Sequence, residues 1–243
     1  MFQTHLPASA AAMGVELSPA QAAQFAEYHE MLRAANRSFN LTRVPDDPAE
    51  AIDRNYLDCL APLARGWPED ARLAIDVGSG AGFPGVPLAI ARPQTRFVLL
   101  DALDKRVKFL QSVVDALGLN AVAVHMRAED AARRPEFRER FDVAVARAVA
   151  PLNVLAEYLA PFVRVGGRMA ALKGPGAEDE LAQAQAALAL LGGDGGRVES
   201  IEIPGRDWSH RLVFVEKLRP TPEKYPRRAG VPEKKPLIAA KSC

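Results

Sequence analysis

The sequence is poor in cysteine, in histidine and in long hydrophobic runs. Its 243 residues include 2 cysteines and 4 histidines. Two cysteines exclude a disulfide scaffold, and the histidines show no metal-ligand spacing, so we expect a reducing compartment and no metal. No apolar run reaches the roughly 20 residues of a membrane span. No basic segment followed by an apolar core marks a secretory signal. We therefore expect a cytoplasmic protein that binds no membrane.

Charge is almost balanced, but it is unevenly distributed. The net charge is +1, which favours no class of partner. From Lys217 to Cys243, eight basic residues stand against two glutamates, so this segment carries +6 and the rest of the chain −5. A basic, proline-rich tail is either a phosphate-contacting arm or a solvated terminus. A second basic group has acidic neighbours, and we interpret it as a solvated helical face: Arg127, Arg133, Arg134, Arg138 and Arg140.

The periodicity changes once along the chain. In the first 65 residues, apolar residues recur every three or four positions, as in Phe25, Tyr28 and Leu32, which predicts helices. A second helix should follow Pro48. From Leu73 onward, short apolar runs alternate with amphipathic segments, which is typical of a parallel sheet covered by helices. We predict strands near 72–77, 96–101, 121–126, 141–146 and 167–173, and helices that begin at Asp104, Pro151 and Ala177.

The end of this region differs from its beginning. The runs "RVESIEI" and "RLVFVEK" are separated by residues 204–210, too few for a helical crossover, so the two strands should be antiparallel neighbours. An α/β series of five strands closed by a hairpin resembles the seven-stranded, Rossmann-like sheet of class I S-adenosylmethionine methyltransferases, with helices on both faces.

A glycine-rich loop, "DVGSGAGFPG", follows the first predicted strand at residues 76–85. Its alternating glycines let the backbone turn tightly and bring N–H groups close to a nucleotide-like ligand. Gly80, Gly82 and Gly85 also form G-x-G-x-x-G, with Asp101 about 20 residues further on, which is the dinucleotide pattern. An NAD-dependent oxidoreductase is therefore an alternative, although no proton-transfer pair on a second domain is evident.

Several polar residues follow the predicted strands, where open α/β sheets bind ligands. Asp101 ends the second strand, and its carboxylate can accept hydrogen bonds from ribose hydroxyls, because Asp104 is expected to cap the next helix. Arg147 ends the fourth strand among small neighbours that leave its guanidinium free. The sequence lacks an Asp/Asn-Pro-Pro-aromatic motif, which favours a ring nitrogen over an exocyclic amine as methyl acceptor.

Several stretches together resemble the RsmG/GidB family of ribosomal RNA methyltransferases, from about Asn36 to Leu237. They are "NLT", "DVGSGAGFPGVPLAI", "LLDALDKRVKFL", "RAED", "ARAVAPL", "ALKGP" and "KYPRRAGVPEKKPL". The resemblance implies methylation of guanine N7 in the decoding region of 16S rRNA, with S-adenosylmethionine as cofactor. It divides the chain into an N-terminal helical extension (1–65), a methyltransferase domain (66–220) and a basic tail (221–243).

The resemblance also implies roles for individual residues. Arg147 and Lys173 are expected at the reacting centre, where Lys173 is otherwise a solvent-facing strand end. The expected cofactor-binding residues are Gly78, Gly80, Phe83, Asp101, Ala128, Glu129 and Arg147. The expected RNA contacts are Tyr225, Arg227 and Arg228, with the alternative that Tyr225 pins the tail to the domain.

Three positions stay open at this stage. Asn40 and Thr42 of "NLT" contact the cofactor or target base, or form a local turn. Asn55 stands where relatives usually carry His, in "RNYLDC", which questions any role of that position. The expected partner is free 16S rRNA or the small subunit, and the expected oligomeric state is a monomer. A non-catalytic RNA-binding assembly factor is a second alternative.

Overall fold

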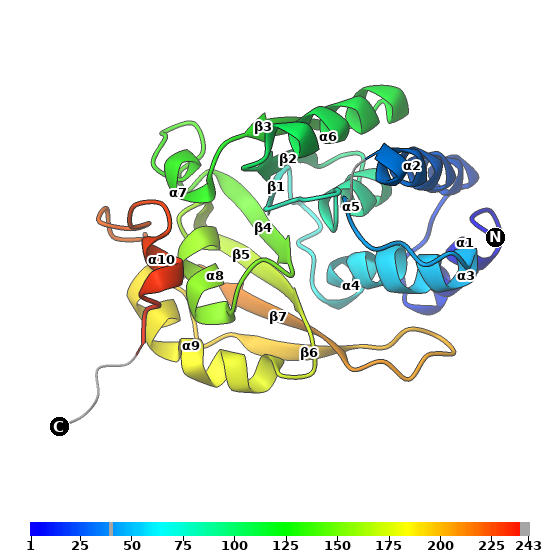
Figure 1. The fold of residues 1–243 in the computed structure, drawn as a ribbon. Coiled ribbons are helices and arrows are strands. Elements are labelled where there is room, and N and C mark those ends of the chain that lie inside the picture. The colour runs from blue at the N-terminus through cyan, green and yellow to red at the C-terminus, as the bar shows by residue number, and fades with distance from the viewer. Residues whose placement is uncertain (39–40, 239–243) are drawn as a thin grey trace.

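The computed structural model describes residues 1–38 and 41–238. Asn40, Lys241 and Cys243 lie outside the described residues. Within the described chain, seven strands form one sheet in the order β3-β2-β1-β4-β5-β7-β6 (Figure 1). The strands are β1 (Leu73–Val77), β2 (Arg96–Asp101), β3 (Ala121–His125), β4 (Phe141–Arg147), β5 (Val163–Lys173), β6 (Arg197–Ile201) and β7 (His210–Glu216).

The strand directions follow the prediction. Strands β1 to β5 are parallel, whereas β7 is antiparallel to both β5 and β6. The hairpin expected from the short connection is therefore confirmed. One boundary differs: β5 begins at Val163, not near 167, because its pairing with β4 shifts register between Phe141 and Val143 and then continues.

The sheet is buried on both faces because its side chains alternate. In β2, Phe97 and Leu99 belong to one hydrophobic core, and Val98 and Leu100 belong to the other. Helices α5 (Gly85–Ala91) and α6 (Asp104–Leu117) cover the first face, and α7 (Ala128–Ala131), α8 (Leu152–Leu159) and α9 (Ala177–Leu191) cover the second (Figure 1). Such a sheet is a stable platform for residues at its strand ends.

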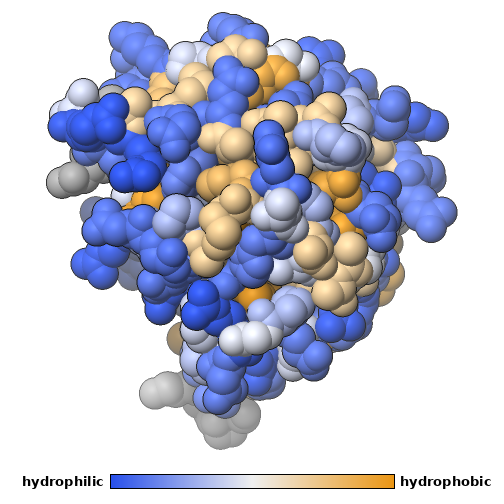
Figure 2. All heavy atoms as spheres, turned by 90° about the vertical axis from the view of Figure 1, so that its right-hand side faces the viewer, coloured by the Kyte–Doolittle hydropathy of each residue, from blue (hydrophilic) through white to orange (hydrophobic). Residues whose placement is uncertain are grey.

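The N-terminal helices pack on the first face. They are α1 (His5–Ala12), α2 (Pro19–Ser38), α3 (Pro48–Ala51), the π-helical segment η1 (Ile52–Leu57) and α4 (Asp58–Arg65). The side chain of Asp47 accepts hydrogen bonds from the N–H groups of Ala49 and Glu50, so a helix begins at Pro48 as predicted. The outer face of these helices is mostly hydrophilic, with smaller hydrophobic groups between (Figure 2).

The N-terminal helices and the sheet share one core. Phe25 and Tyr28 of α2 are fully buried in the same cluster as Phe97 of β2. The boundary expected between residues 65 and 66 therefore marks a change in the sequence pattern, but the hydrophobic core continues across it. The three-part division of the chain stays a prediction.

One predicted helix cap is wrong. Asp104 is the first residue of α6, and its side chain pairs with Lys108 at 2.8 Å instead of capping the helix. Gly118 ends α6 in the left-handed conformation, as expected.

The C-terminal segment returns to the sheet's second face. It includes α10 (Val231–Lys234), which lies against α8 (Figure 1). Its first basic residue, Lys217, has a fully buried side chain that donates to Glu139 at 3.0 Å and to the carbonyls of Ala160 and Val163. Desolvation lowers the pKa of Lys217. The described part of the basic segment therefore begins with a buried anchor and is not a wholly solvated terminus.

Candidate active site

The glycine-rich loop connects β1 to α5 and is held by its own backbone. Gly78 and Ser79 donate N–H bonds to the Leu100 carbonyl at 2.8 and 3.0 Å, which ties the loop to the end of β2. Gly82 and Phe83 donate to the Ser79 carbonyl. These N–H groups are therefore satisfied within the protein. What the loop offers a ligand is the close approach of Gly78, whose φ of +76° a side chain would strain.

A tyrosine of the N-terminal helices fixes the same loop. Tyr28 Oη donates to the Ala81 carbonyl at 2.7 Å, and both residues are buried. A Cβ on Gly82 would lie 2.7 Å from Tyr28 Oη, so only glycine fits at this position. The ring of Tyr28 also lies 5.6 Å from that of Phe83. Helix α2 therefore positions the loop.

Asp76 lies beneath the loop. Its Oδ2 accepts the N–H of Gly85 at 2.9 Å, and its Oδ1 has no hydrogen-bond partner among the described atoms. Burial raises the pKa of Asp76 to about 7, against the lowering effect of the Gly85 hydrogen bond. A buried carboxyl group therefore supports the turn through the Gly85 N–H.

A first pocket opens at the ends of β1, β2 and β3, and we call it the strand-end pocket. Four of the expected cofactor-binding residues line it: Gly78, Asp101, Ala128 and Glu129. Gly80, Phe83 and Arg147 do not line it. Phe83 is 5% exposed, and its ring lies beneath the Arg147 guanidinium at 4.5 Å. Four of the seven expected cofactor-binding residues therefore share this pocket, and the role of each toward a cofactor stays a prediction.

Asp101 has structural contacts that its sequence position did not reveal. Its Oδ2 accepts the Gly80 N–H at 2.8 Å, and its Oδ1 accepts the Leu103 N–H at 2.9 Å. Asp101 thus holds the glycine loop and the start of α6 while it lines the strand-end pocket. Arg106 Nη1 also lies 3.5 Å from Oδ2, so the acceptor capacity left for a ligand lies mainly at Oδ1.

A second pocket begins where the first ends, and we call it the junction pocket. Val149 lines both, and Arg147, Lys173, Asp58 and His210 line the junction pocket. Ala148, with φ of 55°, turns the chain between Arg147 and Val149. The segment after β4 therefore separates the two pockets.

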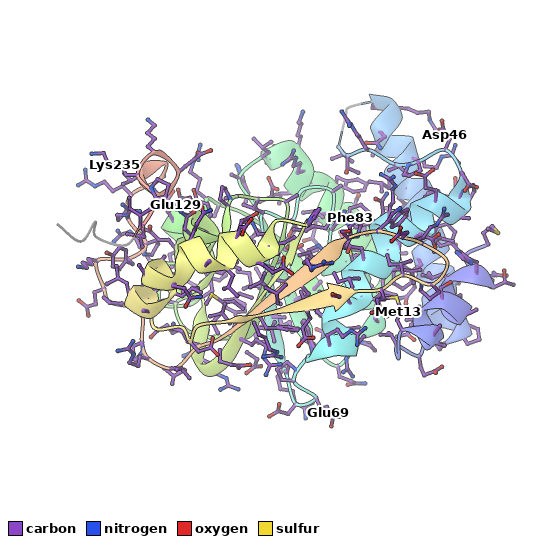
Figure 3. All side chains as sticks on the ribbon, turned by 90° about the horizontal axis from the view of Figure 1, so that it is seen from below. Met13, Asp46, Glu69, Phe83, Glu129 and Lys235 are labelled. Carbon is purple, nitrogen blue, oxygen red and sulfur yellow. The ribbon has the colours of Figure 1, made fainter. Side chains whose placement is uncertain are left out.

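A third, larger groove continues from the junction pocket toward the N-terminal helices. Asp58, Arg147 and His210 line both, and the groove extends to Thr42 and Asn55. In Figure 3, Glu129 lies near the C-terminal segment, Asp46 lies toward the N-terminal helices, and Phe83 lies between them in this view. The three cavities thus form one track at the edge of the sheet.

Arg147 lines both the junction pocket and the groove. Its Nη1 lies 3.5 Å from Asp58 Oδ2 and donates to the Arg54 carbonyl at 3.4 Å. Asp58 in turn pairs with His210, whose Nδ1 lies 3.1 Å from Asp58 Oδ1. The side chain of Arg147 is 19% exposed. Asp58 and Phe83 therefore hold a mostly buried guanidinium with one edge at the cavities.

Lys173 is not the solvent-facing strand end of the alternative interpretation. Its side chain is 8% exposed, and Nζ donates to the Ala150 carbonyl at 2.6 Å and to Glu180 Oε2 at 2.7 Å. Glu180 also accepts the Leu152 N–H. Lys173 shares the junction pocket with Arg147 and ties the segment after β4 to α9.

Of the "NLT" stretch, the structure describes Leu41 and Thr42, and Asn36 holds both through hydrogen bonds. Asn36 donates to the Thr42 carbonyl at 2.8 Å and accepts the N–H of Leu41 at 2.9 Å. Thr42 also lines the groove, as does Asn55, whose Nδ2 lies 3.5 Å from the Arg43 carbonyl. Asn55 therefore occupies a wall of the groove in a π-helical segment, a feature frequent at functional sites.

The expected RNA-contact residues of the tail do not share one environment. The ring of Tyr225 is 7% exposed within the second core, so it is not available for base stacking in this conformation. Arg227 pairs with the buried Glu157 at 2.6 Å. Arg228 is exposed. The geometry favours the alternative in which Tyr225 pins the tail to the domain.

The second basic group is not a simple solvated face. Arg138 donates to the carbonyls of Tyr225 and Thr221 at 2.8 Å each, and Arg133 donates to the carbonyl of Pro226. Two arginines of this group therefore hold the tail through its backbone.

Sequence reasoning missed several residues of the track. Tyr158, Gly230 and Glu233 line the strand-end pocket, and Asp58 and His210 line the junction pocket. Tyr158 looks like part of an ordinary helix, and no local pattern marks it. The available sequence signal was the spacing of three residues between Asn55 and Asp58, which places the two on one face of a helix.

Two features are absent from the described part of the structure. Across residues 1–38 and 41–238, no helix has the length and apolar character to cross a membrane. Among the described side chains, no group of three or more His, Cys, Asp or Glu lies together in a way that would hold a metal ion.

The fold is that of class I S-adenosylmethionine-dependent methyltransferases, as the sequence predicts. The cofactor-bound Rv0187 from MTB has a TM-score of 0.54 and 22% identity, over 84% of this chain and 91% of that chain. The S-adenosylmethionine-dependent methyltransferase SibL has a TM-score of 0.53 and 17% identity, over 81% of this chain and 70% of that chain. These likenesses establish the architecture.

Sequence comparison defines the family. The family rRNA small subunit methyltransferase G (GidB) matches residues 21–207. Proteins named Ribosomal RNA small subunit methyltransferase G are similar over most of the chain. The one from Clostridium perfringens (strain 13 / Type A) is 42% identical over 226 residues, 93% of this chain and 94% of that protein. The one from Leuconostoc citreum (strain KM20) is 46% identical over 227 residues, 92% of this chain and 94% of that protein.

The chain therefore belongs to the rRNA small subunit methyltransferase G family. Membership confirms the resemblance drawn from the motifs and the enzyme class, a methyltransferase. The NAD-dependent oxidoreductase, which the literal G-x-G-x-x-G left open, is wrong.

Proposed function

We propose that this protein transfers the methyl group of S-adenosylmethionine to N7 of a guanine in the decoding region of 16S rRNA. The observation that carries the proposal is the series of three cavities, in which Val149 lines the strand-end and junction pockets and Arg147 lines the junction pocket and the groove. Family membership supplies the class of reaction and of substrate.

The strand-end pocket fits the adenosine part of the cofactor. Val77, Leu100 and Met126 supply apolar walls for a flat base, and the carboxylates of Asp101 and Glu129 supply acceptors for hydroxyl and amino groups. Gly78 supplies close backbone approach, since a Cβ there would lie 2.9 Å from Val149. Gly80 and Phe83 act indirectly, by fixing the loop.

The reaction needs alignment more than proton transfer. When bound, S-adenosylmethionine supplies a sulfonium methyl group, so that a C–N bond to N7 forms, the C–S bond breaks and positive charge moves from sulfur to the base. Guanine N7 presents an in-plane lone pair, so the chain has no proton to remove. Its residues orient the guanine toward the junction pocket, and positioning of this kind supplies several kcal/mol.

Arg147 is the residue we assign to the guanine. The guanidinium is a donor only, and guanine O6 lies beside N7 on the same edge, so Arg147 can hold the base by O6. Asp58 and Phe83 fix the guanidinium from behind. Lys173 also faces the junction pocket, and its bonds to Ala150 and Glu180 make it a positioning residue for the segment after β4.

In this proposal the RNA presents its guanine to the junction pocket and contacts the C-terminal segment, which lies on the side of the strand-end pocket. The exposed tail residues Arg228, Lys234 and Lys235 are available for phosphate contacts. Arg227 is committed to Glu157, and Tyr225 to the core. The partner is 16S rRNA, free or in the small subunit, the location is the cytoplasm, where that rRNA is assembled, and the enzyme acts as a monomer.

The test is methyl transfer from labelled S-adenosylmethionine to 16S rRNA that lacks the modification, offered both free and in purified small subunits. We expect N7-methylguanosine by mass spectrometry of the nucleosides, and the preferred form identifies the stage of assembly at which the enzyme acts. A different methylated nucleoside contradicts the proposed acceptor. RNA binding with cofactor binding but no transfer supports the assembly-factor alternative.

A further inference from the structure

The strand-end pocket has a wall that comes from the other end of the chain. Gly230 and Glu233 of the C-terminal segment line it together with Tyr158 of α8, on the side of Ala128 and Glu129. In Figure 1, α10 lies beside α8, on the side of the molecule where α7 also lies. More than 100 residues of sequence separate the two sides of the pocket, so local sequence patterns gave no sign of it.

One ion pair anchors this segment. The carboxylate of Glu157 is fully buried and accepts four bonds from Arg227: from its backbone N–H at 2.7 Å, from Nε at 3.0 and 3.1 Å, and from Nη2 at 2.6 Å. Formation of this pair, led by its hydrogen bonds, raises the pKa of Arg227. A bidentate pair that also takes a backbone N–H fixes direction as well as position.

Further contacts fix the segment on both sides of Arg227. Arg133 and Arg138 bind the carbonyls of Pro226 and Tyr225, and the Tyr225 ring lies in the core. On the other side, the Gly230 N–H donates to Glu129 Oε1 at 2.9 Å. Glu129 is itself a wall of the pocket, so the last contact joins the segment directly to the expected cofactor-binding residues.

We infer that residues 225–234 form a cofactor-binding element, which closes the adenosine end of the strand-end pocket through Gly230 and Glu233. The inference rests on the proposed function, because it takes this pocket as the S-adenosylmethionine site. It reassigns Arg227 from RNA contact to a positioning residue for the cofactor, since its donors are directed to Glu157.

The first test uses substitutions in the full-length protein. Arg227→Met removes the anchor, and the double variant Arg227→Met with Glu157→Met removes it without leaving a buried charge unpaired. We expect both to raise the Kd for S-adenosylhomocysteine at least tenfold, by calorimetry, as loss of a charge-assisted contact predicts. The cofactor KM should rise with them, and kcat at saturating cofactor should stay near that of the unchanged protein.

Arg219→Ala is the matched control. Arg219 belongs to the same basic segment, but it donates to the Ala189 carbonyl of α9 and does not line the pocket. We expect an unchanged Kd. If both Arg227 variants fold, as their melting curves show, and bind cofactor like the unchanged protein while their RNA affinity and its salt dependence fall, then Arg227 is an RNA contact and the inference is wrong.

A second measurement needs no substitution. Hydrogen exchange of the unchanged protein, with and without S-adenosylhomocysteine, should slow in peptides that cover 225–235 as well as in those that cover 76–85. The β6–β7 connection, 202–209, serves as the internal reference, and we expect no change there. Protection of 76–85 without 225–235 overturns this inference alone. Absence of binding and of protection everywhere overturns the proposed function as well.

Discussion

The strand-end pocket and the groove each share residues with the junction pocket, but they are built differently. The pocket gathers residues from the ends of consecutive parallel strands, and its glycine loop is fixed by internal hydrogen bonds. The groove is lined by side chains, including the acids Asp46, Asp47 and Glu50 and the bases Arg43 and Arg54, which come from the N-terminal helices and their connection.

The difference indicates how each region responds to change. The strand-end pocket sets ligand affinity through a loop that many residues support, so we expect a substitution there to act on binding. The groove sets orientation through individual side chains, so we expect a substitution there to act on turnover. Arg147 is the last residue of β4, and it lines the groove and not the strand-end pocket.

The largest effect is expected at this boundary. Arg147→Ala should lower kcat about 100-fold, the usual loss when one preorganised donor is removed from a reacting centre. The cofactor Kd should change little, because Arg147 does not line the strand-end pocket. Steady-state kinetics with both substrates, together with calorimetry, separate the two quantities. Unchanged turnover removes Arg147 from the site, and a loss confined to cofactor affinity merges the two regions.

Asp76→Asn tests the support beneath the loop through its pH dependence. The pKa of Asp76 is raised to about 7 by burial, from about 4 in an unfolded chain. Well below pH 4 the carboxyl is protonated in both states, so its ionisation has no effect on stability. Between pH 4 and pH 7 the carboxyl ionises in the unfolded chain but stays protonated in the native protein. The free energy of unfolding therefore falls by about 1.4 kcal/mol for each unit by which the pKa is raised. Above pH 7 the loss is constant.

The measurement is denaturant unfolding of both proteins between pH 4 and 8. The stability of Asp76→Asn relative to the unchanged protein should increase up to about pH 7 and then level off. Parallel pH profiles for the two proteins show that Asp76 is not a buried titrating group.

Asp101→Ala should weaken cofactor binding by about 1–3 kcal/mol, because the carboxylate lines the pocket and also holds the N–H groups of Gly80 and Leu103. Asp101→Asn, which keeps one acceptor oxygen, should lie between. At saturating cofactor, kcat should be nearly restored. Calorimetry and initial rates provide the check, and a kcat that stays low at saturation places Asp101 at the reacting centre instead.

Tyr28→Phe should give the smallest effect. It removes only the hydroxyl that binds the Ala81 carbonyl, so we expect a loss of about 0.5–1.5 kcal/mol in stability and a cofactor affinity a few times weaker. Thermal unfolding and calorimetry measure the two. Tyr56→Phe is a matched control, since Tyr56 Oη is hydrogen-bonded to His29 and not to the loop. Equal effects on cofactor affinity from both would show that the contact with the loop is not what matters.

The sequence predicted the first region better than the second, for a physical reason. Strands of a two-sided sheet appear as short apolar runs, and the carboxyl ends of parallel strands meet at one edge, so Gly78, Asp101 and Glu129 were predictable neighbours. The hairpin was predictable from the length of its connection.

The remaining features depend on contacts that sequence patterns do not encode. The burial of Lys217 and Tyr225 follows from carbonyls and helices distant in the chain, so a basic, proline-rich composition gave no sign of it. The pairing of Asp58 with His210 joins residues from opposite parts of the fold. Asp104 was predicted as a helix cap from its residue type alone. In the structure, Asp101 accepts the N–H of Leu103, the residue that precedes α6.

The division between the two regions is tested most directly by a structure of this protein with S-adenosylhomocysteine. The account predicts adenosine in the strand-end pocket, between Gly78 and Gly230, with the sulfur directed to the junction pocket and Arg147. A ligand whose adenosine lies in the groove, against Asn55 and Asp58, would contradict it.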